Sequence, residues 1–458
     1  MSLLSELQQH LSKSPLKDAA DIVVAYSGGV DSHVLLHALH HLKQSQNFDF
    51  QIHAIHIHHG LSQHADKWQD HCRQVCATLG VSFQTAKVVV QAAPRQSLEA
   101  QARAARYQNL VALAPADSQV LLGQHQDDQL ETFLLQLKRG AGPKGLSAMN
   151  RTWLVTSPLQ ANQQVGFYRP LLDVSQQAIL DYAHQHELKW CEDESNQDTD
   201  FERNFLRHKV LPTLQQRWPE ISQAVARSAA LCAEQQSLLD ASSAEKLQLI
   251  KASENSLQIA ALKQLSQPWL HQLVRYWLSE LNIQSPSLTV LNKLSPEVLN
   301  AAQDATPILQ WNGWQFRRFD QQLFVIKTPP EKVIFNTIWQ QQKSITLPNN
   351  MGYLVFSSDG NIDKKTQLTI KPNLGPIAVK MGGYSLRFTP QGSDHSKPIK
   401  QWFKQWKIAP WIRETALLIL QNDQVLGVYV NGYWHVAQPL EPITNHEEVW
   451  HITVSDGA

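Results

Sequence analysis

Over residues 21–138 the chain alternates short apolar runs with longer stretches in which apolar residues recur at helical spacing. The short runs predict strands at 21–26, 50–59, 81–90 and 118–124. The stretches between them predict helices at 31–42, 64–79 and 97–114, and a further helix that starts near Asp127. Repeated strand–helix units form a parallel sheet that helices cover on both faces. Ligands of such sheets bind where the strands end, so the polar motifs there are the candidates for function.

The pattern changes after residue 215. Residues 216–305 are mainly helical in pattern, and short strands are predicted over 307–327. The stretch KTPPEK (327–332) is typical of a linker, and the runs beyond it alternate like short strands. We therefore predict an α/β domain over 1–215, a mainly helical domain over 216–327 and a small β-rich α+β domain over 333–458.

Composition adds two limits. The chain has 458 residues, of which 43% are apolar and 17% charged, as in an ordinary globular protein of several domains. Lys+Arg and Asp+Glu both number 40, so overall charge predicts no partner and any nucleic-acid signal must be local. The first 20 residues resemble a short amphipathic helix rather than an export signal, and no apolar run is long enough for a membrane span. We expect a cytoplasmic protein with no membrane partner.

Cysteine and histidine are present, but their number and spacing favour ordinary structural roles over disulfide bonds or metal binding. Four cysteines are too few for a disulfide scaffold in a chain of this length. Cys72 and Cys76 share a helix face without further zinc ligands nearby, so we interpret them as small buried apolar side chains. Four histidines follow one predicted strand, where alternation favours one buried row and one solvent row over a metal site; they are His53, His56, His58 and His59.

The stretch VVAYSGGVDSHVLL (23–36) leads from the first predicted strand, through a small polar loop, into the first predicted helix. Its glycines let backbone N–H groups approach a ligand closely, and the helix start adds partial positive charge. Ser27 and Ser32 add hydroxyl groups. The loop lacks the lysine of an ordinary P-loop and carries Asp31 at the helix start instead. A carboxylate beside phosphates is consistent with Mg²⁺, which favours phosphate binding over a glycine turn that Asp31 merely caps.

This loop, S-G-G-V-D-S, resembles the PP-loop signature S-G-G-x-D-S of the N-type ATP pyrophosphatase superfamily. The resemblance implies a Rossmann-like domain that grips the pyrophosphate of ATP and transfers AMP to an oxygen, after which a nucleophile displaces the AMP. It also implies that the loop residues bind ATP and that Asp31 binds Mg²⁺. These ATP-binding residues are Ser27, Gly28, Gly29, Val30, Asp31 and Ser32.

A second polar cluster, in GQHQDDQLETF (123–133), follows the fourth predicted strand. Asp128 and Glu131 lie three apart on one helix face, with His125 and Asp127 just before them. A capping arrangement at the helix start explains one acid. It does not explain why three carboxylates and a histidine occur together. Such a cluster of like charges costs free energy unless cations bind to it. We expect Mg²⁺ or an ammonium substrate at this cluster.

Five further stretches narrow the substrate. They are HHGL (58–61), EAQARAARY (99–107), KRGAGPKGLSAM (138–149), RPLLDVSQQAILDYA (169–183) and DESNQDTDFERNFLRHKVLP (193–212). Together with the loop they resemble the bacterial tRNA(Ile)-lysidine synthetase family over residues 20–215. Residues 386–420 are similar to the small C-terminal domain of the long form of that family, whereas the middle segment fits by position more than by motif.

The resemblance implies a C–N bond-forming ligase. ATP would adenylate the C2 oxygen of the wobble cytidine in an isoleucine tRNA with a CAU anticodon. The ε-amine of L-lysine would then attack C2 and AMP would leave. The product, lysidine, pairs with A rather than G and changes decoding from methionine to isoleucine. ATP and Mg²⁺ are the implied cofactors, the tRNA and L-lysine are the implied partners, and the oligomeric state, monomer or homodimer, stays open.

The same resemblance gives roles to the second cluster. Asp128 and Glu131 would grip the lysine ammonium groups or a metal, with His125 and Asp127 shaping the pocket. Arg203, within ERNFLR, matches an Arg-Asn pair of the family and would meet the lysine carboxylate or a phosphate. The division of roles among these residues stays open.

Two basic features are candidates for contacts with phosphate or tRNA. Arg106 either contacts a phosphate or is a surface helix charge paired with Glu99. Residues 380–413 carry seven Lys or Arg against the single acid Asp394, and Trp402, Phe403, Trp406 and Trp411 interleave with them. We predict that the aromatic side chains belong mainly to the core and that the basic ones face tRNA. The predicted tRNA-binding residues are Lys397, Lys400, Lys404, Lys407 and Arg413.

Two alternative functions fit the sequence less well than the ligase does. A PP-loop tRNA thiolase of the 2-thiocytidine type would need a C-x-x-C pair, whereas Cys72 and Cys76 are four apart. A non-catalytic tRNA-binding protein would be expected to have lost its acids, whereas Asp31, Asp128 and Glu131 are present. Both features favour the ligase.

Overall fold

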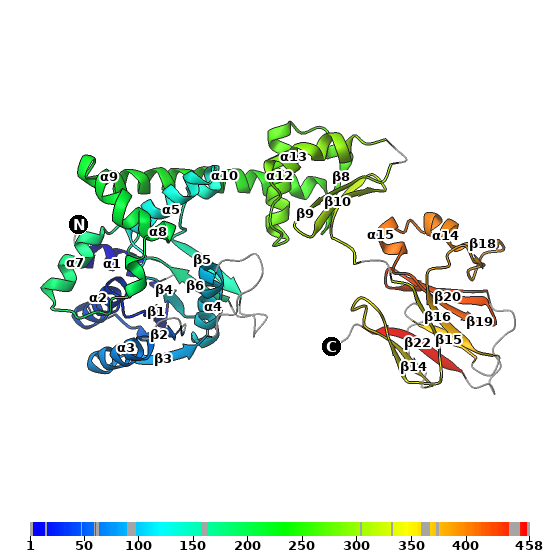
Figure 1. The fold of residues 1–458 in the computed structure, drawn as a ribbon, viewed down its shortest axis with the longest axis horizontal. Coiled ribbons are helices and arrows are strands. Elements are labelled where there is room, and N and C mark those ends of the chain that lie inside the picture. Colours follow the sequence, from blue (N-terminus) through cyan, green and yellow to red (C-terminus); the bar gives the residue numbers. More distant parts are fainter. Residues whose placement is uncertain are drawn as a thin grey trace. The chain divides into compact units, whose positions relative to one another are not determined.

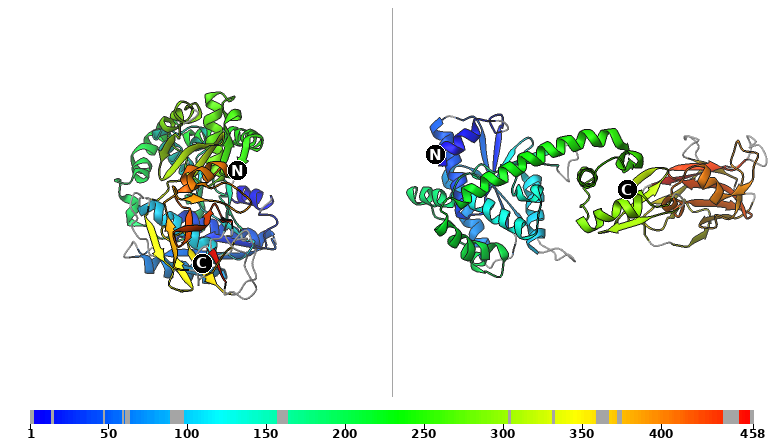
Figure 2. Two further views of the ribbon diagram at one scale, coloured as in Figure 1. Left: turned by 90° about the vertical axis from the view of Figure 1, so that its right-hand side faces the viewer. Right: turned by 90° about the horizontal axis from the view of Figure 1, so that it is seen from above.

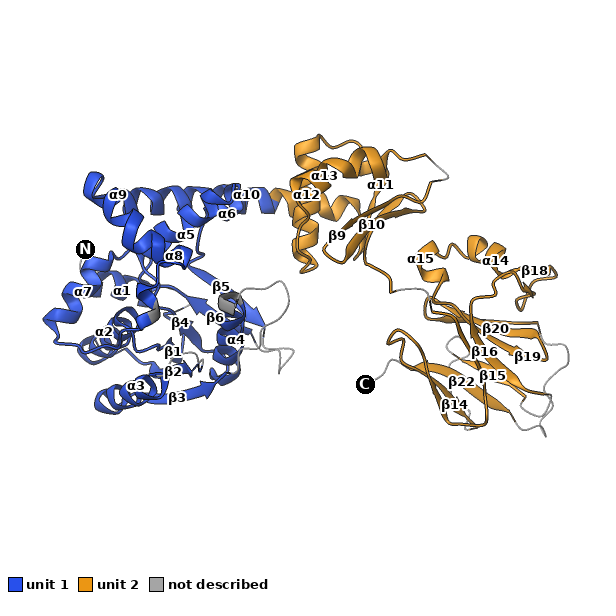
Figure 3. Ribbon diagram, in the orientation of Figure 1, with its two compact units in different colours: residues 1–241 blue, residues 242–458 orange. Residues whose placement is uncertain are grey.

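The computed structural model divides into two compact units, Met1–Ala241 and Ser242–Ala458 (Figure 3). The division falls within helix α10 (Ile221–Ile250), the longest helix among the described residues (Figure 2). The predicted domain boundaries at 215 and 327 stay predictions. The structure describes residues 3–13, 16–46, 48–58, 60, 64–88, 98–156, 164–302, 305–330, 333–358, 367–371, 375–438 and 449–455.

The first unit is built on a six-stranded sheet of order β3-β2-β1-β4-β6-β5 (Figure 1). Its strands are β1 (Asp21–Ala25), β2 (Gln51–His58), β3 (Ser82–Lys87), β4 (Gln119–Leu121), β5 (Thr152–Thr156) and β6 (Gln164–Tyr168). All neighbouring strands run parallel except β5, which pairs antiparallel with β6. The four predicted strands and the parallel sheet are confirmed, whereas the antiparallel edge was not predicted.

Helices cover both faces of this sheet. Val23 and Val24 are neighbours on β1 and point to opposite sides, as side chains of a strand must. Val24 packs in a core with helices α1, α2 and α7, while Val23 packs in a second core with α4. The helices of this unit are α1 (Leu3–Leu11), α2 (Val30–Gln46), α3 (Ala65–Leu79), α4 (Leu98–Leu113), α5 (Gln126–Lys138), α6 (Pro143–Leu146), α7 (Gln176–Gln185), α8 (Glu202–Phe205), the π-helix η2 (Leu206–Val210), α9 (Leu211–Arg217) and the short 3₁₀-helix η1 (Glu194–Gln197).

The second unit begins with helices packed on a five-stranded sheet of order β7-β8-β11-β10-β9. Trp277 and Phe316 lie at the centre of its core. The predicted strands over 307–327 are confirmed, but β7 and β8 were missed because each has only three residues. The elements are α11 (Ile259–Leu262), α12 (Gln267–Glu280), α13 (Leu288–Lys293), the π-helix η3 (Leu294–Leu299), β7 (Lys251–Ser253), β8 (Ser256–Gln258), β9 (Ile308–Trp311), β10 (Trp314–Phe319) and β11 (Gln322–Lys327).

The remainder of the second unit is β-rich, as predicted. A five-stranded sheet, β12-β16-β19-β20-β21, and a four-stranded sheet, β13-β14-β22-β15, share one core, while α14 packs on a second core. The elements are β12 (Phe335–Ile338), β13 (Ser344–Thr346), β14 (Tyr353–Ser357), β15 (Leu368–Ile370), β16 (Ile377–Met381), β17 (Arg387–Phe388), β18 (Lys397–Pro398), α14 (Ile399–Gln405), α15 (Pro410–Arg413), β19 (Leu417–Gln421), β20 (Gln424–Val430), β21 (Tyr433–Val436) and β22 (Trp450–Ser455). Within the described residues, no helix combines the length and apolar character that crossing a bilayer requires.

Candidate active site

The polar loop between β1 and α2 is held in shape by hydrogen bonds of its own side chains. Gly28 has a φ of 88°, a left-handed conformation that glycine adopts without strain. The hydroxyl oxygens of Ser27 and Ser32 lie 3.0 Å apart, and the Gly29 N–H donates to Ser27 Oγ at 3.3 Å. Val30 begins α2, so the helix start opens directly onto the loop. This arrangement provides backbone donors for an anion without a lysine.

Neighbouring elements hold the loop in place. A Cβ on Gly28 would lie 2.9 Å from Cys72 Sγ, and the Cys191 N–H donates to the Gly28 carbonyl at 2.9 Å. A Cβ on Gly123, after β4, would lie 3.0 Å from the Ser32 nitrogen. Cys72 and Cys76 are fully buried free thiols, which confirms their interpretation as small apolar side chains. The loop therefore has little room to change shape.

Asp31 stands in the first turn of α2 with an unsatisfied oxygen. Its Oδ1 is buried and accepts no hydrogen bond from the described residues, although the side chain as a whole is 37% exposed. Burial raises the pKa of the Asp31 carboxyl, and the nearby Asp128 adds to the shift while His125 opposes it. A buried carboxylate oxygen without a partner is costly unless a cation joins it. The residue thus fits the predicted Mg²⁺ ligand.

His125 links this loop to helix α5. It caps the helix: its Nδ1 accepts from the Asp127 N–H at 3.3 Å, while the Asp128 carboxylate accepts from the His125 N–H at 3.0 Å. Because Nδ1 is an acceptor, the ring proton of the neutral imidazole lies on Nε2. Nε2 lies 3.4 Å from Asp128 Oδ2 and 3.7 Å from Asp31 Oδ1. The predicted capping arrangement is therefore present, together with a contact that joins the two polar clusters.

Glu131 is held by two arginines. Its side chain is 1% exposed, and it accepts from Arg203 Nε and Arg207 Nε, both at 2.7 Å. The second nitrogen of Arg207 also donates to Glu131, at 3.1 Å, and to Asp128 Oδ1, at 3.2 Å. Arg203 reaches the same Asp128 oxygen at 3.5 Å. Both oxygens of Glu131 are therefore occupied by guanidinium groups, which differs from the open carboxylate that the sequence suggested.

These contacts set the charges of the cluster. Burial alone would raise the pKa of Asp128, but His125, Arg203 and Arg207 together hold it below its ordinary value. Burial would lower the pKa of Arg207, but Glu131 and Asp128 raise it. Asp128 is therefore a stable carboxylate and Arg207 a stable cation, whereas Asp31 is the acid whose charge is least supported.

The structure brings together five of the predicted residues, namely Asp31, His125, Asp128, Glu131 and Arg203. Asp127 lies beside them and is buried, with 9% exposure. Sequence reasoning missed Arg207, although its spacing of four from Arg203 places both on one helix face. Arg106 is not a plain surface charge, because its Nε is buried without a partner among the described residues and burial lowers its pKa.

The histidines of β2 make ordinary hydrogen bonds. His53 pairs with Asp21 at 2.6 Å, His56 with the Tyr26 carbonyl at 2.9 Å and His58 with Asp66 at 3.2 Å. His59 lies outside the described residues. The described residues contain one group of possible metal ligands, Glu6, His10 and Asp173. Both ring nitrogens of His10 already have partners, Tyr168 and Arg151, so this group carries no metal proposal.

The predicted tRNA-binding residues lie around α14 and α15. Trp402 and Phe403 are buried, which confirms that these aromatic side chains belong to the core. Lys400 and Lys404 are exposed on the same helix. Lys397 lies over the Trp402 ring, with its ammonium 4.9 Å from the centroid. Lys407 pairs with Asp320 at 2.9 Å, and Arg413 donates to the Ile408 carbonyl at 2.8 Å. Their binding to tRNA stays a prediction.

Comparisons with known proteins agree along most of the chain. Residues 2–214 match a family model described as a PP-loop domain, residues 257–324 a TilS substrate binding domain and residues 377–452 a TilS substrate C-terminal domain. A tRNA(Ile)-lysidine synthase of Serratia proteamaculans is 41% identical over 93% of this chain and 95% of its own. Those of Vibrio cholerae and Edwardsiella ictaluri are 40% and 38% identical, each over 93% of this chain and 94% of the relative.

Proposed function

Because the chain belongs to the tRNA(Ile)-lysidine synthase family, we propose that it joins L-lysine to the wobble cytidine of a CAU-anticodon tRNA(Ile) at the expense of ATP. The observation that carries this proposal is Oδ1 of Asp31, which has no hydrogen-bond partner among the described residues. It lies at the mouth of a lysine-free phosphate loop, 3.7 Å from Nε2 of His125. Such a site suits a nucleotide whose phosphates bring a cation with them. The protein would act in the cytoplasm, where tRNA is modified.

The loop would hold the pyrophosphate part of ATP. Backbone N–H groups of Gly28 to Ser32 and the start of α2 favour negative charge there. Asp31 would hold Mg²⁺, which offsets charge on the phosphates and supports departure of pyrophosphate. The C2 oxygen of cytidine then bonds to the α-phosphorus while the bond to pyrophosphate breaks. The adenylated carbon then becomes open to attack. The ε-ammonium would first lose a proton to solvent, and the neutral amine would bond to C2 while the bond from C2 to the oxygen of AMP breaks and a second proton passes to solvent.

The second cluster would position L-lysine. Since both Glu131 oxygens contact arginines, we assign Glu131 to positioning Arg203 and Arg207 rather than to gripping the substrate. Neither arginine uses its Nη1 on a described residue, so these nitrogens are available for the lysine carboxylate or a phosphate. Asp127 would face the ammonium groups, while Asp128, whose oxygens already accept from Arg207 and from the His125 N–H, would add negative charge beside them. His125, with its proton on Nε2, would orient Asp128 and Asp31 rather than act as a base.

The test is mass spectrometry of the wobble nucleoside. The protein is incubated with ATP, Mg²⁺, L-lysine and a CAU-anticodon transcript, which is then digested to nucleosides. We expect a gain equal to one lysine minus one water, absent from a transcript with another base at the wobble position and absent without lysine. Transfer of labelled sulfur would instead support the thiolase, and binding without any modification would support the non-catalytic alternative.

A further inference from the structure

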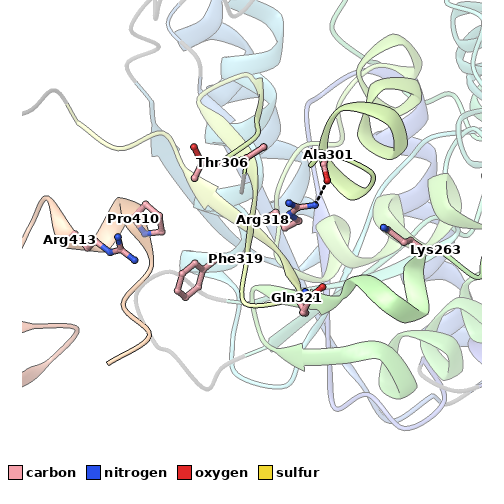
Figure 4. A pocket seen from close by; sticks show the side chains of 9 residues that line it. Lys263, Ala301, Thr306, Arg318, Phe319, Gln321, Pro410 and Arg413 are labelled. Atoms are coloured by element: carbon pink, nitrogen blue, oxygen red, sulfur yellow. Dashed lines mark hydrogen bonds between the residues drawn. The ribbon is translucent and has the colours of Figure 1, made fainter. Parts of the chain in front are cut away.

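The second unit contains a cavity of about 410 Å³ whose lining is strongly basic (Figure 4). Three cationic side chains, Lys263, Arg318 and Arg413, line it. Phe319, Thr306 and Gln321 also line it and contribute an aromatic ring, a hydroxyl and an amide. None of the described residues that line the cavity is acidic. Of the three cations, only Arg413 belongs to the basic segment predicted to face tRNA.

The two arginines are fixed by uncharged partners. Arg318 donates to the carbonyls of Ala301, at 2.8 Å, and Ala302, and Arg413 donates to the carbonyl of Ile408, at 2.8 Å. Carbonyl oxygens hold a guanidinium in place without cancelling its charge. Burial lowers the pKa of Arg413, and no carboxylate offsets that loss of hydration. The cavity therefore keeps uncompensated positive charge at fixed positions.

Three charged side chains near the cavity are already engaged. Lys407 pairs with Asp320 at 2.9 Å, and the guanidinium of Arg317 lies 5.7 Å from the centre of the Trp411 ring. Asp320 stands next to Phe319 in sequence but is used by Lys407 and does not line the cavity. The positive charge of the cavity is thus available to a ligand rather than to a neighbouring acid.

We propose that this cavity binds one unpaired nucleotide of the tRNA substrate, with its base against Phe319 and its flanking phosphates on the basic side chains at the two ends of the lining, Lys263 on one side and Arg413 on the other (Figure 4). Three cations in one lining suit the sugar–phosphate backbone, because guanidinium and ammonium groups match its charge and donate several hydrogen bonds to phosphate. An aromatic ring beside them suits the flat face of a base without regard to its identity. Thr306 and Gln321 offer polar groups to the sugar or base edge. This proposal rests on the proposed function, because tRNA is the polyanion that the reaction supplies.

The test compares tRNA binding by Lys263→Gln and Arg413→Gln over a series of salt concentrations. Each variant is expected to weaken binding by about three- to tenfold and to reduce the slope of log K against log salt by about one. Phe319→Leu keeps an apolar side chain but loses the aromatic face, so it should weaken binding by about fivefold or more with the slope unchanged. In the modification assay these losses should appear in KM more than in kcat.

Lys251→Gln is the matched control, because Lys251 is an exposed lysine on β7 of the same unit and does not line the cavity. Cavity variants that match this control in affinity and slope, with melting temperatures equal to wild type, would overturn the proposal. Free AMP that binds wild type but not Lys263→Gln, while tRNA binding is unchanged, would also overturn it. A wild-type protein that binds the transcript without forming lysidine would refute the proposed function alone, since the binding comparison would still stand.

Discussion

The carboxylates of the phosphate loop and of the first two turns of α5 differ in how many hydrogen bonds they accept. On α5, Glu131 is 1% exposed and accepts three hydrogen bonds from two arginines. In the loop region, the buried Oδ1 of Asp31 accepts none from the described residues. His125 connects the two regions, since its Nε2 lies between Asp31 and Asp128. A saturated carboxylate serves the scaffold, whereas an unsaturated one is ready for a ligand.

The largest expected effect separates the two roles by activity. Asp31→Asn keeps the shape of the side chain but removes the charge that would hold Mg²⁺. We expect lysidine formation to fall by about a hundredfold or more, as when an electrostatic group at a reacting centre is lost. The rate of lysidine formation at saturating ATP measures it. If Asp31→Asn retained the wild-type rate while Glu131→Gln lost it at unchanged stability, the assignment of roles would have to be exchanged.

The next effect concerns stability at α5. Glu131→Gln would remove one of the two carboxylates that Arg203 and Arg207 share. Breaking a buried pair from one side costs about 3–5 kcal/mol. We expect about 2–4 kcal/mol here, because Asp128 still accepts from Arg207 and the arginine side chains are partly exposed. The unfolding transition of the first unit, followed in urea, measures this loss. Lys138→Gln is the control, because the Lys138–Glu202 pair is 2.5 Å long but has side chains that are 64% and 62% exposed. It should cost less than about 1 kcal/mol. Equal losses in the two variants would contradict this account.

A smaller effect tests how tightly the phosphate loop is held. Gly28→Ala meets both a φ of 88° and a Cβ position 2.9 Å from Cys72 Sγ, so we expect a loss of about 1–3 kcal/mol. Gly29→Ala is the control, since its Cβ would have Ser27 Oγ at 3.5 Å as its nearest neighbour. Combining Gly28→Ala with Cys72→Ala removes the crowding but not the backbone strain. Recovery in this double variant should therefore be partial, and thermal melting of the four proteins measures it.

The length and position of each strand explain how much of the fold the sequence could predict. Strands β1 to β4 are short apolar runs between helical patterns, so their presence and type followed from periodicity. Strand β5, TWLVT, is an exposed edge with alternating burial, and its antiparallel pairing depends on a hairpin rather than on a strand–helix unit. Strands β7 and β8 have three residues each, too few for a pattern to be visible. Local periodicity thus predicted β1 to β4, but it predicted neither these short or peripheral strands nor β6, which lies inside the sheet between β4 and β5.

The candidate site shows a similar limit. The acids of the loop and of α5 could be found from their motifs, because each motif is local. Their partners could not, since Arg207 Nε reaches Glu131 across 76 residues of sequence and the contact exists only after α8 and η2 pack beside α5. Sequence therefore indicated which side chains were chemically unusual, but the fold decided that Glu131 is satisfied and that Asp31 is not.

The smallest effect is a pH dependence of stability at Asp31. The folded protein raises the pKa of this carboxyl, so folding favours its protonated form and ionisation lowers stability as the pH rises through the folded pKa. Asp31→Asn cannot ionise and should melt slightly higher than wild type at neutral pH without nucleotide. The difference is about 1 kcal/mol at most, because solvent screens a side chain that is 37% exposed. It should shrink as the pH falls toward the ordinary pKa of an aspartate, about 4, because the wild-type carboxyl gains its proton above that pH. Mg²⁺ with ATP should reverse the order at neutral pH, because the ligands stabilise only a protein that still carries the charge.

A wild-type protein that melts higher than Asp31→Asn at neutral pH without ligands would mean that Asp31 already has a stabilising partner, and the contrast with Glu131 would then disappear.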